Sequence, residues 1–508
     1  MRLSVVFCLL VLFSGVLLAQ EAEVSAKGEP FRVHLKEAIT LALKNNLDIQ
    51  IESFNPEIQQ TSVDFEESRF EPFFGANINT TDSTNPTGSI LVGEDAITSE
   101  NLTYNFNLVQ KLQTGTSYSV TFDNSRVETN QSFTSVNPRF DSTLFANVTQ
   151  PLMRDFGIDI TKTPMQIATE NRIASDHRLR QRMMDIALQV EQAYWLLVFF
   201  YRNLDVRKQS LALAQELYEN NKKQVEVGTM APLEIVTAEA EVAAREEGII
   251  TTENLIANTE DILRNLVLSE KNKDKWNTQF IPVDEPGLTP LNMTEDEAIQ
   301  RAMENNPDLK ALKSDVESRK LSTKLASNAL KPQLDLKASI GFAGLGGDTL
   351  LLDDSTFPPQ VIGTVPGSYG DALSSMFDNN TWSVGFVVGI PIGNQGREAD
   401  YVRADLSQKQ MTRILDSTRE QLILNVRTAV RNLQSDMKRY DATRASRTLQ
   451  ERKLDAEKKK LAVGLSTNYI VLDYQDDLAE AQSSELRAIV DYERNLAQLD
   501  RYLGAILP

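Results

Sequence analysis

Three carboxylates in one stretch of the sequence could act together on ions. Asp473, Asp477 and Glu480 are spaced four and three residues apart, which places them on one face of a helix. Beside an aqueous channel, such a face would attract cations and repel anions at the mouth. The alternative is an ordinary solvated helix face, because carboxylates lie at protein surfaces unless they are paired. The spacing alone leaves both interpretations open.

Catalytic and metal-binding chemistry has little support in this sequence. There is one cysteine, Cys8, and the two histidines, His34 and His177, lie on separate segments. Cysteine-based zinc sites, iron–sulfur clusters and disulfides are therefore excluded. No serine or cysteine lies with a histidine in an arrangement typical of nucleophilic catalysis. The glycines from Gly341 to Gly347 end an alternating segment, and no helix follows in the order that phosphate binding needs. We expect no enzyme activity, no cofactor and no metal site.

The composition and charge exclude further classes of protein. Of 508 residues, 24% are charged and 41% are hydrophobic, so the chain is neither disordered nor low in complexity. The formal net charge is −19, whereas a nucleic-acid-binding protein needs a basic surface. We expect no nucleic-acid partner.

The N-terminus predicts export. Arg2 precedes an apolar run from Val5 to Leu12, and Ala19 follows, which is the pattern of a signal peptide over residues 1–19. An N-terminal anchor helix is the alternative, but the apolar run is short for a bilayer. No later segment has 18 uninterrupted apolar residues, so any membrane crossing has to use β-strands.

The chain contains two copies of one pattern. The segment Glu37–Asp48 recurs as Glu297–Asp308, with seven of twelve positions identical. The pair Val227-Gly228 likewise recurs as Val463-Gly464. Such self-similarity indicates a duplicated structural unit. We predict a first repeat over residues 20–268, a proline-containing linker over 269–293 and a second repeat over 294–508.

Two very long helices are the strongest local signal. Residues 165–227 and 397–463 contain no glycine and no proline, and as helices they would be about 95 Å long or more. Apolar residues recur with spacings of four and three, as at Ile186, Val190 and Ala193, which is typical of heptad packing. We predict rods with a glycine turn and a returning helix after each. The predicted helices span about 160–227, 232–268, 396–463 and 468–503.

The first helix of each repeat should begin after a capping residue. Thr294 and Glu297 have the spacing of a capping box, in which each side chain bonds to the other residue's backbone. His34 occupies the equivalent position in the first repeat. We interpret His34 as a weak substitute for the cap, not as a ligand.

Segments within about 70–150 and 332–392 alternate in polarity. One example has apolar residues at Leu102, Tyr104 and Phe106 with polar residues between them. In an exported chain this alternation favours a transmembrane barrel, and an antiparallel sandwich with one wet face is the alternative. Two strands in each half give four, or six if a hairpin at 103–126 also inserts. Since a closed barrel needs at least about eight strands, subunits would have to share it.

Taken together, these features resemble the TolC-type outer-membrane efflux proteins, over about residues 33–504. The resemblance rests on the duplicated Glu-Ala-Ile…Asn-Asn segment and on the strand exits Thr149–Leu152 and Gly389–Ile392. The turn Val463–Asp473 contributes to it as well. It implies an α+β membrane protein with two tandem structural repeats per chain. In that fold, a trimeric outer-membrane β-barrel continues into a long periplasmic α-helical barrel.

The resemblance also implies a function and partners. The chain would be a homotrimeric exit duct of a tripartite efflux or secretion system, lying in outer-membrane lipid and extending into the periplasm. Substrates would pass through it passively from an inner-membrane transporter, which a periplasmic adaptor (membrane fusion) protein would connect to the duct. The sequence does not identify the cargo. The family pattern has four strands per subunit, or twelve in all, and the extra hairpin of the first repeat departs from it.

Residues at the two glycine turns would form the periplasmic tip of such a duct. The expected adaptor contacts are the following residues: Gly228, Gly464, Leu465, Ser466 and Thr467. Asp473 matches a position at which relatives place an acidic residue in the constriction, while Ile470 departs from a second such position. Glu234 is acidic at the equivalent place in the first repeat, and Asp477 shares the helix face of Asp473.

Two other functions remain open at the level of sequence. A periplasmic coiled-coil structural protein would use its β segments as a sandwich and would not enter a bilayer. An uptake porin would be an open pore, and its loss would not affect export.

Overall fold

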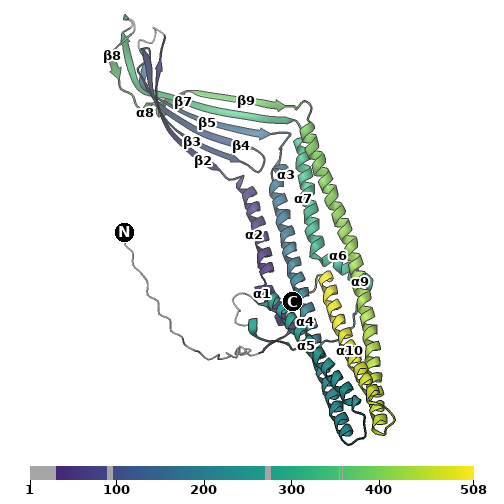
Figure 1. Ribbon diagram of the computed structural model, residues 1–508. Coiled ribbons are helices and arrows are strands. Elements are labelled where there is room, and N and C mark those ends of the chain that lie inside the picture. Colours follow the sequence, from purple (N-terminus) through teal and green to yellow (C-terminus); the bar gives the residue numbers. More distant parts are fainter. Residues whose placement is uncertain (1–29, 89–94, 269–275, 354, 357–358) are drawn as a thin grey trace, which may run out of the picture.

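Two helices run most of the length of the molecule. The computed structural model describes residues 30–88, 95–268, 276–353, 355–356 and 359–508, so the expected signal peptide and part of the expected linker lie outside the described residues. Helix α4 (Thr163–Glu226) has 64 residues and α9 (Gln395–Ala462) has 68, about 95–100 Å each. Figure 1 shows a sheet at one end of these rods and two helical hairpins at the other.

Shorter helices flank each rod at both ends. Near the sheet, α2 (Leu47–Ser68) packs on α4, and α7 (Pro307–Ala329) packs on both α4 and α9. At the far end, α5 (Leu233–Val267) returns along α4, and α10 (Asn468–Leu503) returns along α9 and also contacts α4. The same order of elements therefore occurs twice, as two chain repeats packed side by side.

One asparagine joins the first two helices of each repeat. Asn46 ends α1 (Leu35–Asn45) and begins α2, and its Oδ1 accepts hydrogen bonds from the backbone of Asp48 and Ile49. Asn306 does the same between α6 (Glu295–Asn305) and α7. Asparagine is a favoured cap because its side-chain oxygen satisfies the orphan N–H groups of the first turn. This role explains why the second asparagine of each Asn-Asn pair recurs.

The two predicted caps have different outcomes. The capping box of Thr294 and Glu297 is confirmed, with both reciprocal hydrogen bonds present. The prediction for His34 is wrong, because its side chain makes no cap hydrogen bond. Instead, Asp284 accepts a hydrogen bond of 2.7 Å from the N–H of Leu35, and it holds His34 Nδ1 at 2.9 Å. A carboxylate from the segment between the repeats therefore caps α1.

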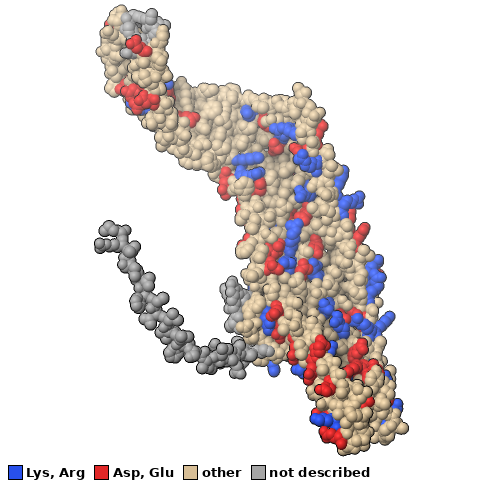
Figure 2. All heavy atoms as spheres, in the orientation of Figure 1, with Lys and Arg blue, Asp and Glu red and all other residues tan. Residues whose placement is uncertain are grey.

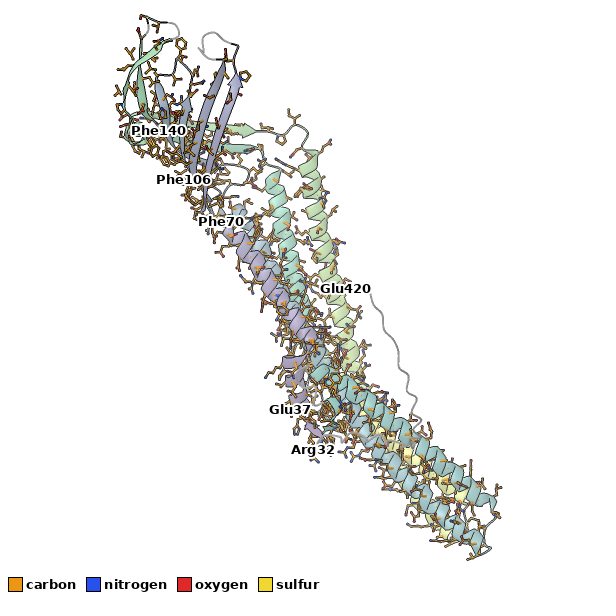
Figure 3. The ribbon with its side chains drawn as sticks, turned by 60° about the vertical axis from the view of Figure 1, so that its left-hand side comes forward. Arg32, Glu37, Phe70, Phe106, Phe140 and Glu420 are labelled. Carbon is orange, nitrogen blue, oxygen red and sulfur yellow. The ribbon has the colours of Figure 1, made fainter. Side chains whose placement is uncertain are left out.

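The core lies at the middle level of the molecule. The apolar stretch of α4 around Tyr194 and Leu197 packs beneath α1 and beside two short parallel strands, β1 (Phe31–Val33) and β6 (Phe280–Pro282). The stretch therefore packs where outer elements cross the rod. In Figure 3, Arg32 and Glu37 mark this level, while Phe70 marks the junction of helix and sheet. Among the described residues, no helix combines the length and the apolar composition that crossing a membrane needs.

A single antiparallel sheet forms the other end. Its strands, in chain order, are β2 (Phe73–Pro86), β3 (Ala96–Lys111), β4 (Ser117–Thr129), β5 (Val136–Pro151), β7 (Gln333–Asp353), β8 (Gln360–Val365) and β9 (Asn380–Gly389). Their order is β2-β3-β4-β5-β7, and β8 and β9 pair with opposite halves of β7. A short helix, α8 (Tyr369–Ser375), packs on β7. In the part of the chain that the structure describes, no second sheet covers this one, so the sandwich is not formed.

Candidate functional site

The two glycine turns lie at the free ends of the helical hairpins. Gly228 (φ +80°) links α4 to α5, and Gly464 (φ +73°) links α9 to α10. In each turn, the N–H of the residue after the glycine donates a hydrogen bond of 2.9 Å to the carbonyl oxygen five residues earlier. The two bonds run from Thr229 to Gln224 and from Leu465 to Lys460. This is the pattern of a helix end that needs a left-handed residue, for which glycine has no Cβ penalty.

The end of the second hairpin presents the other residues expected at the tip. The Leu465 side chain is 77% exposed, and Thr467 is the exposed residue before α10. Ser466 Oγ donates a hydrogen bond of 2.6 Å to Glu457 and so fixes the turn against α9. Further exposed apolar side chains surround both turns: Val227, Leu233, Val463 and Tyr469. Clustered exposed apolar residues are typical of contact surfaces.

The acidic residues expected in a constriction lie on two different hairpins. Asp473 is exposed on α10, and Asp477 on the same helix forms an ion pair of 2.8 Å with Lys453. The hydrogen bond that Lys453 donates to Asp477 raises the pKa of Lys453 above its usual value. Glu234 lies in the first turn of α5, and its backbone oxygen accepts a hydrogen bond from Asn221. Asp473 therefore presents its charge more freely than Asp477.

Two buried asparagines connect the hairpin ends, and neither is among the residues predicted from the sequence. Asn221 on α4 and Asn468 on α10 are 1% and 6% exposed, and Asn468 Nδ2 donates a hydrogen bond of 2.8 Å to Asn221 Oδ1. Asn221 continues the buried stripe of Ala214 and Leu217 with heptad spacing. A polar residue in an apolar heptad stripe signals a specific partner, and this signal was present in the sequence.

A second contact, between a buried arginine and an exposed carboxylate, crosses between the hairpins higher up. Arg245 on α5 is 8% exposed, and its guanidinium lies 2.9 Å from Glu241 and 2.7 Å from Asp476 on α10. Arg245 also donates to the backbone and side-chain oxygens of Ser210 on α4. Burial raises the pKa of Asp476 to about 6 and Glu241 adds to the rise, although Arg245 opposes it. These groups line a cavity of about 370 Å³ between α4, α5 and α10.

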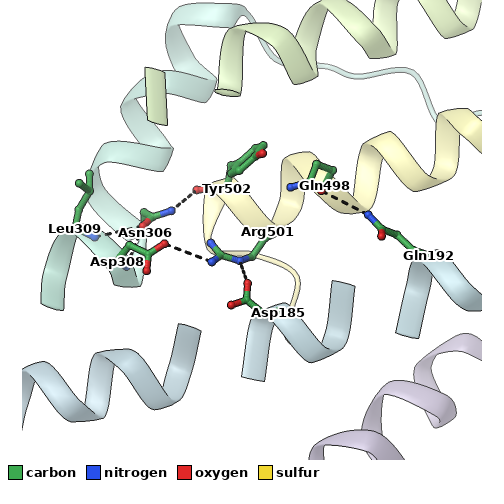
Figure 4. Close-up of polar contacts among 8 residues, drawn as sticks. All are labelled: Asp185, Gln192, Asn306, Asp308, Leu309, Gln498, Arg501 and Tyr502. Atoms are coloured by element: carbon green, nitrogen blue, oxygen red, sulfur yellow. Dashed lines mark hydrogen bonds and ion pairs between the residues drawn. The ribbon is translucent and has the colours of Figure 1, made fainter. Parts of the chain in front are cut away.

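The upper end of α10 is fixed by a separate polar network (Figure 4). Arg501 Nε lies 2.6 Å from Asp185 on α4, and its Nη2 lies 3.4 Å from Asp308 on α7. Beside it, Asn306 Nδ2 donates to the backbone oxygen of Tyr502. Burial raises the pKa of Asp308, while Arg501 opposes the rise. The α9–α10 hairpin is thus anchored to both repeats at its top, whereas the two contacts described above hold its lower part.

The two faces of the sheet differ in polarity. One row of neighbours across six strands consists of Phe74, Leu108, Val120, Ala146, Ile340 and Trp382. The next row faces the other way and consists of Gly75, Asn107, Thr121, Phe145, Gly341 and Thr381. On the face in view in Figure 2, charged side chains are dense along the helices and sparse over the middle of the sheet. This is the polarity of a wall between lipid and water.

Phe145 is the apolar exception in the polar row. A Cβ built on the neighbouring Gly341 would lie 2.5 Å from the ring of Phe145. The ring therefore occupies the space above the glycine, and this contact supports a strand position that has no side chain of its own.

Apolar side chains on the outside of α2 have no partner within the described chain. Leu47, Ile51, Phe54 and Ile58 follow heptad spacing, and each is more than half exposed. Val402 and Leu406 on α9 are exposed in the same way. Apolar stripes of this kind bury themselves against other helices, so they indicate contacts between subunits.

The comparisons with known proteins agree with this architecture. Residues 298–505 match the family model described as outer membrane efflux protein. The crystal structure of the Campylobacter jejuni CmeC outer membrane channel has a TM-score of 0.64 and 16% identity, covering 93% of this chain and 85% of that chain. A comparison with curated proteins gives no match.

Two further structures are similar to the chain over nearly its whole length. The outer-membrane channel OprN has a TM-score of 0.67 and 14% identity, covering 93% of this chain and 91% of that chain. The outer membrane protein VceC from Vibrio cholerae has a TM-score of 0.64 and 15% identity, covering 92% and 96%. At these identities the likeness shows the fold, in which a β-domain continues into long helices. Residues 298–505 thus match the outer membrane efflux protein family, and the chain as a whole has the fold of outer-membrane channels.

Proposed function

We propose that three copies of this chain form a passive duct that receives substrates from an inner-membrane transporter through a periplasmic adaptor protein. The adaptor docks at the hairpin ends, on Gly228, Gly464, Leu465, Ser466 and Thr467. The exposed apolar side chains around these turns carry this proposal, because solvent-exposed apolar clusters at the end of a rod favour a protein partner.

Contacts between the hairpins keep the duct closed until the adaptor docks. Asn221–Asn468 and Arg245–Asp476 are short and link the α4–α5 hairpin to the α9–α10 hairpin. Opening requires α10 to move away from α4 at its lower end, so both contacts have to break. Arg501 and its two carboxylates hold the upper end in place during this motion.

The charge at the narrow end favours cations. Asp473 is exposed, and in a trimer it would recur three times around the axis. A ring of carboxylates selects for cations by electrostatic attraction. Asp477 contributes less because Lys453 neutralises it, and Glu234 adds charge from the first hairpin.

The test replaces a glycine by valine at each of two matched positions. Gly464→Val places a β-branched residue where φ is +73°, and Gly393→Val does the same at φ +74° above α9, far from the hairpin ends. Nothing lies within 4 Å of a Cβ at either position, so the backbone strain is comparable. Trimer content, cross-linking to the adaptor and export would be measured in cells that contain the adaptor and the pump.

We expect both variants to form trimers, and only Gly464→Val to lose adaptor cross-linking and export. Normal export by Gly464→Val trimers would contradict the placement of the adaptor site. Equal losses in both variants would show that the defect comes from backbone strain and not from the tip.

A further inference from the structure

The extra hairpin of the first repeat lies in the middle of the sheet. Strand β3 pairs with β2 from Ala96 to Val109, and β4 pairs with β5 from Ser117 to Val127. If this hairpin lay outside the wall, β2 would pair directly with β5. Because β3 and β4 separate them along their length, the hairpin is a part of the wall.

The turn of this hairpin reaches the helical end of the sheet. It runs from Leu112 to Thr116, and the Leu112 N–H donates a hydrogen bond of 2.7 Å to Thr116. A Cβ built on Gly115 would lie 2.8 Å from the backbone oxygen of Asp155 and 3.1 Å from Thr161 Oγ1. These two residues belong to the segment that leads into α4. The hairpin therefore extends down to the level at which the strands meet the helices.

The two edge strands of the sheet have directions that allow them to pair between neighbouring copies. In the described residues, β2 pairs only with β3, and β9 pairs only with β7. Every pairing in this sheet is antiparallel, and six strands separate the outer edge of β2 from that of β9. Since six is even, β2 and β9 run in opposite directions. The β9 edge of one copy is therefore antiparallel to the β2 edge of the next, and a ring of copies closes without a free edge.

We propose that the trimer has an eighteen-stranded outer wall, in which β9 of each subunit pairs with β2 of the next, and that its exit admits polymer-sized solutes. The proposal rests on the trimeric duct proposed above. With strands about 4.8 Å apart and tilted by about 40°, eighteen strands give a backbone diameter of about 36 Å, against about 24 Å for twelve. Side chains narrow the aqueous width by about 10 Å, to about 26 Å against about 14 Å.

Because the exit is this wide, solutes are selected by size at the helical end. The polar row that faces the lumen carries small side chains and glycines, such as Gly75, Thr121 and Gly341. Few solutes that pass the hairpin ends are therefore excluded by size at the outer exit. Cargo as wide as an extended or helical polypeptide, about 10–12 Å across, passes such an exit with its hydration shell.

The first experiment maps the central hairpin with cysteines. Leu108→Cys and Val120→Cys lie on the apolar face, and their sequence neighbours Asn107→Cys and Thr121→Cys lie on the polar face as matched controls. Purified trimers in lipid vesicles would be treated with a bulky water-soluble maleimide. We expect the polar-face variants to react and the apolar-face variants to react only after denaturation. Reaction of all four would place the hairpin outside the membrane and overturn the proposal.

The second experiment tests the edge pairing. Asn77→Cys or Asn79→Cys on β2 would be combined with Thr381→Cys or Ser383→Cys on β9, and Asn77→Cys with Asn147→Cys is the control pair. We expect disulfide-linked dimers and trimers for at least one β2–β9 pair and none for the control. If every β2–β9 pair stays monomeric on non-reducing gels while native trimers persist, the edge pairing is wrong.

The third experiment measures the width of the exit. Polyethylene glycols of increasing size would be added to the outer side of single channels. We expect polymers up to about 20 Å in diameter to lower the conductance. A cutoff near 14 Å in a conducting trimer would overturn the eighteen-stranded wall and leave the duct function intact, whereas a failure to form conducting trimers would count against the proposed function itself.

Discussion

Asn468 donates a hydrogen bond of 2.8 Å to Asn221 across the boundary between the two helical hairpins, and both side chains are buried. The two residues belong to different repeats, 247 positions apart in the chain. Buried amides that satisfy each other fix the register of packed helices, because any other arrangement leaves a polar group unpaired. This pair therefore determines how the hairpin ends meet.

Removing this amide should loosen the closed state. Asn468→Ala leaves the buried Asn221 oxygen without its donor, at a cost of about 1–3 kcal/mol. We expect a higher open probability in single-channel recordings, by about tenfold. Asn254→Ala is the matched control, because it breaks an Asn254–Asn258 hydrogen bond on the exposed face of α5. Equal open probabilities in the two variants would mean that the buried pair does not hold the duct closed.

The contact between Arg245 and Asp476 should make the duct sensitive to pH. The pKa of Asp476 is raised from 3.8 to about 6 in the closed arrangement, so this arrangement binds the proton more tightly than an open, solvated one. Protonation of Asp476 therefore stabilises the closed arrangement fully below about pH 3.8, and this stabilisation is lost as the pH rises through about 6. Conductance should fall between pH 7 and pH 5.

The matched variant for this prediction is Asp476→Asn, which cannot titrate. Its conductance should be nearly independent of pH in the same interval. The groups that face Asp476 are Arg245 and Glu241 on α5 and Asp473 on its own helix. An unchanged pH profile in Asp476→Asn would assign the titration to another group.

Asp473 should set the ion preference of the channel more strongly than Asp477. Asp473→Ala removes an exposed charge, whereas Asp477 is already paired with Lys453. We expect the reversal potential under a salt gradient to lose most of its preference for cations in Asp473→Ala and to change little in Asp477→Ala. Unaltered selectivity in Asp473→Ala would mean that this carboxylate lies on a solvated face away from the passage.

The Arg501 network should carry much of the stability at the top of α10. Arg501→Met leaves Asp185 and Asp308 without their buried partner, and breaking such a pair costs about 3–5 kcal/mol. Arg202→Met is the control, because its ion pair with Glu285 is exposed and pairs of that kind contribute about 0–1 kcal/mol. Thermal unfolding of the trimers should show a clear loss for Arg501→Met alone. Similar melting temperatures would contradict a structural role for this network.

Local patterns in the sequence predicted the elements that depend on nearby residues. Thr294 and Glu297 lie three positions apart, so the capping box follows from spacing alone. The rods follow from the absence of glycine and proline, and the turns follow from Gly228 and Gly464. In each case the determining interaction lies within a few residues of the chain.

Features that depend on distant partners could not be derived in the same way. His34 stands where a cap is expected, yet Asp284 performs this role from 250 positions away. The number of strands in the wall depends on whether β2 pairs with β3 or with β5, and alternation of polarity does not distinguish the two pairings. The partner of Asn221 was likewise not evident, although its place in a buried stripe marked it as unusual.

The proposed duct is tested most directly by single-channel recording of the purified protein in planar bilayers, with the mass of the oligomer determined in the same detergent. We expect a trimer that conducts with a small, cation-preferring current when the hairpin ends are closed. A soluble species that neither assembles into trimers nor conducts would contradict it.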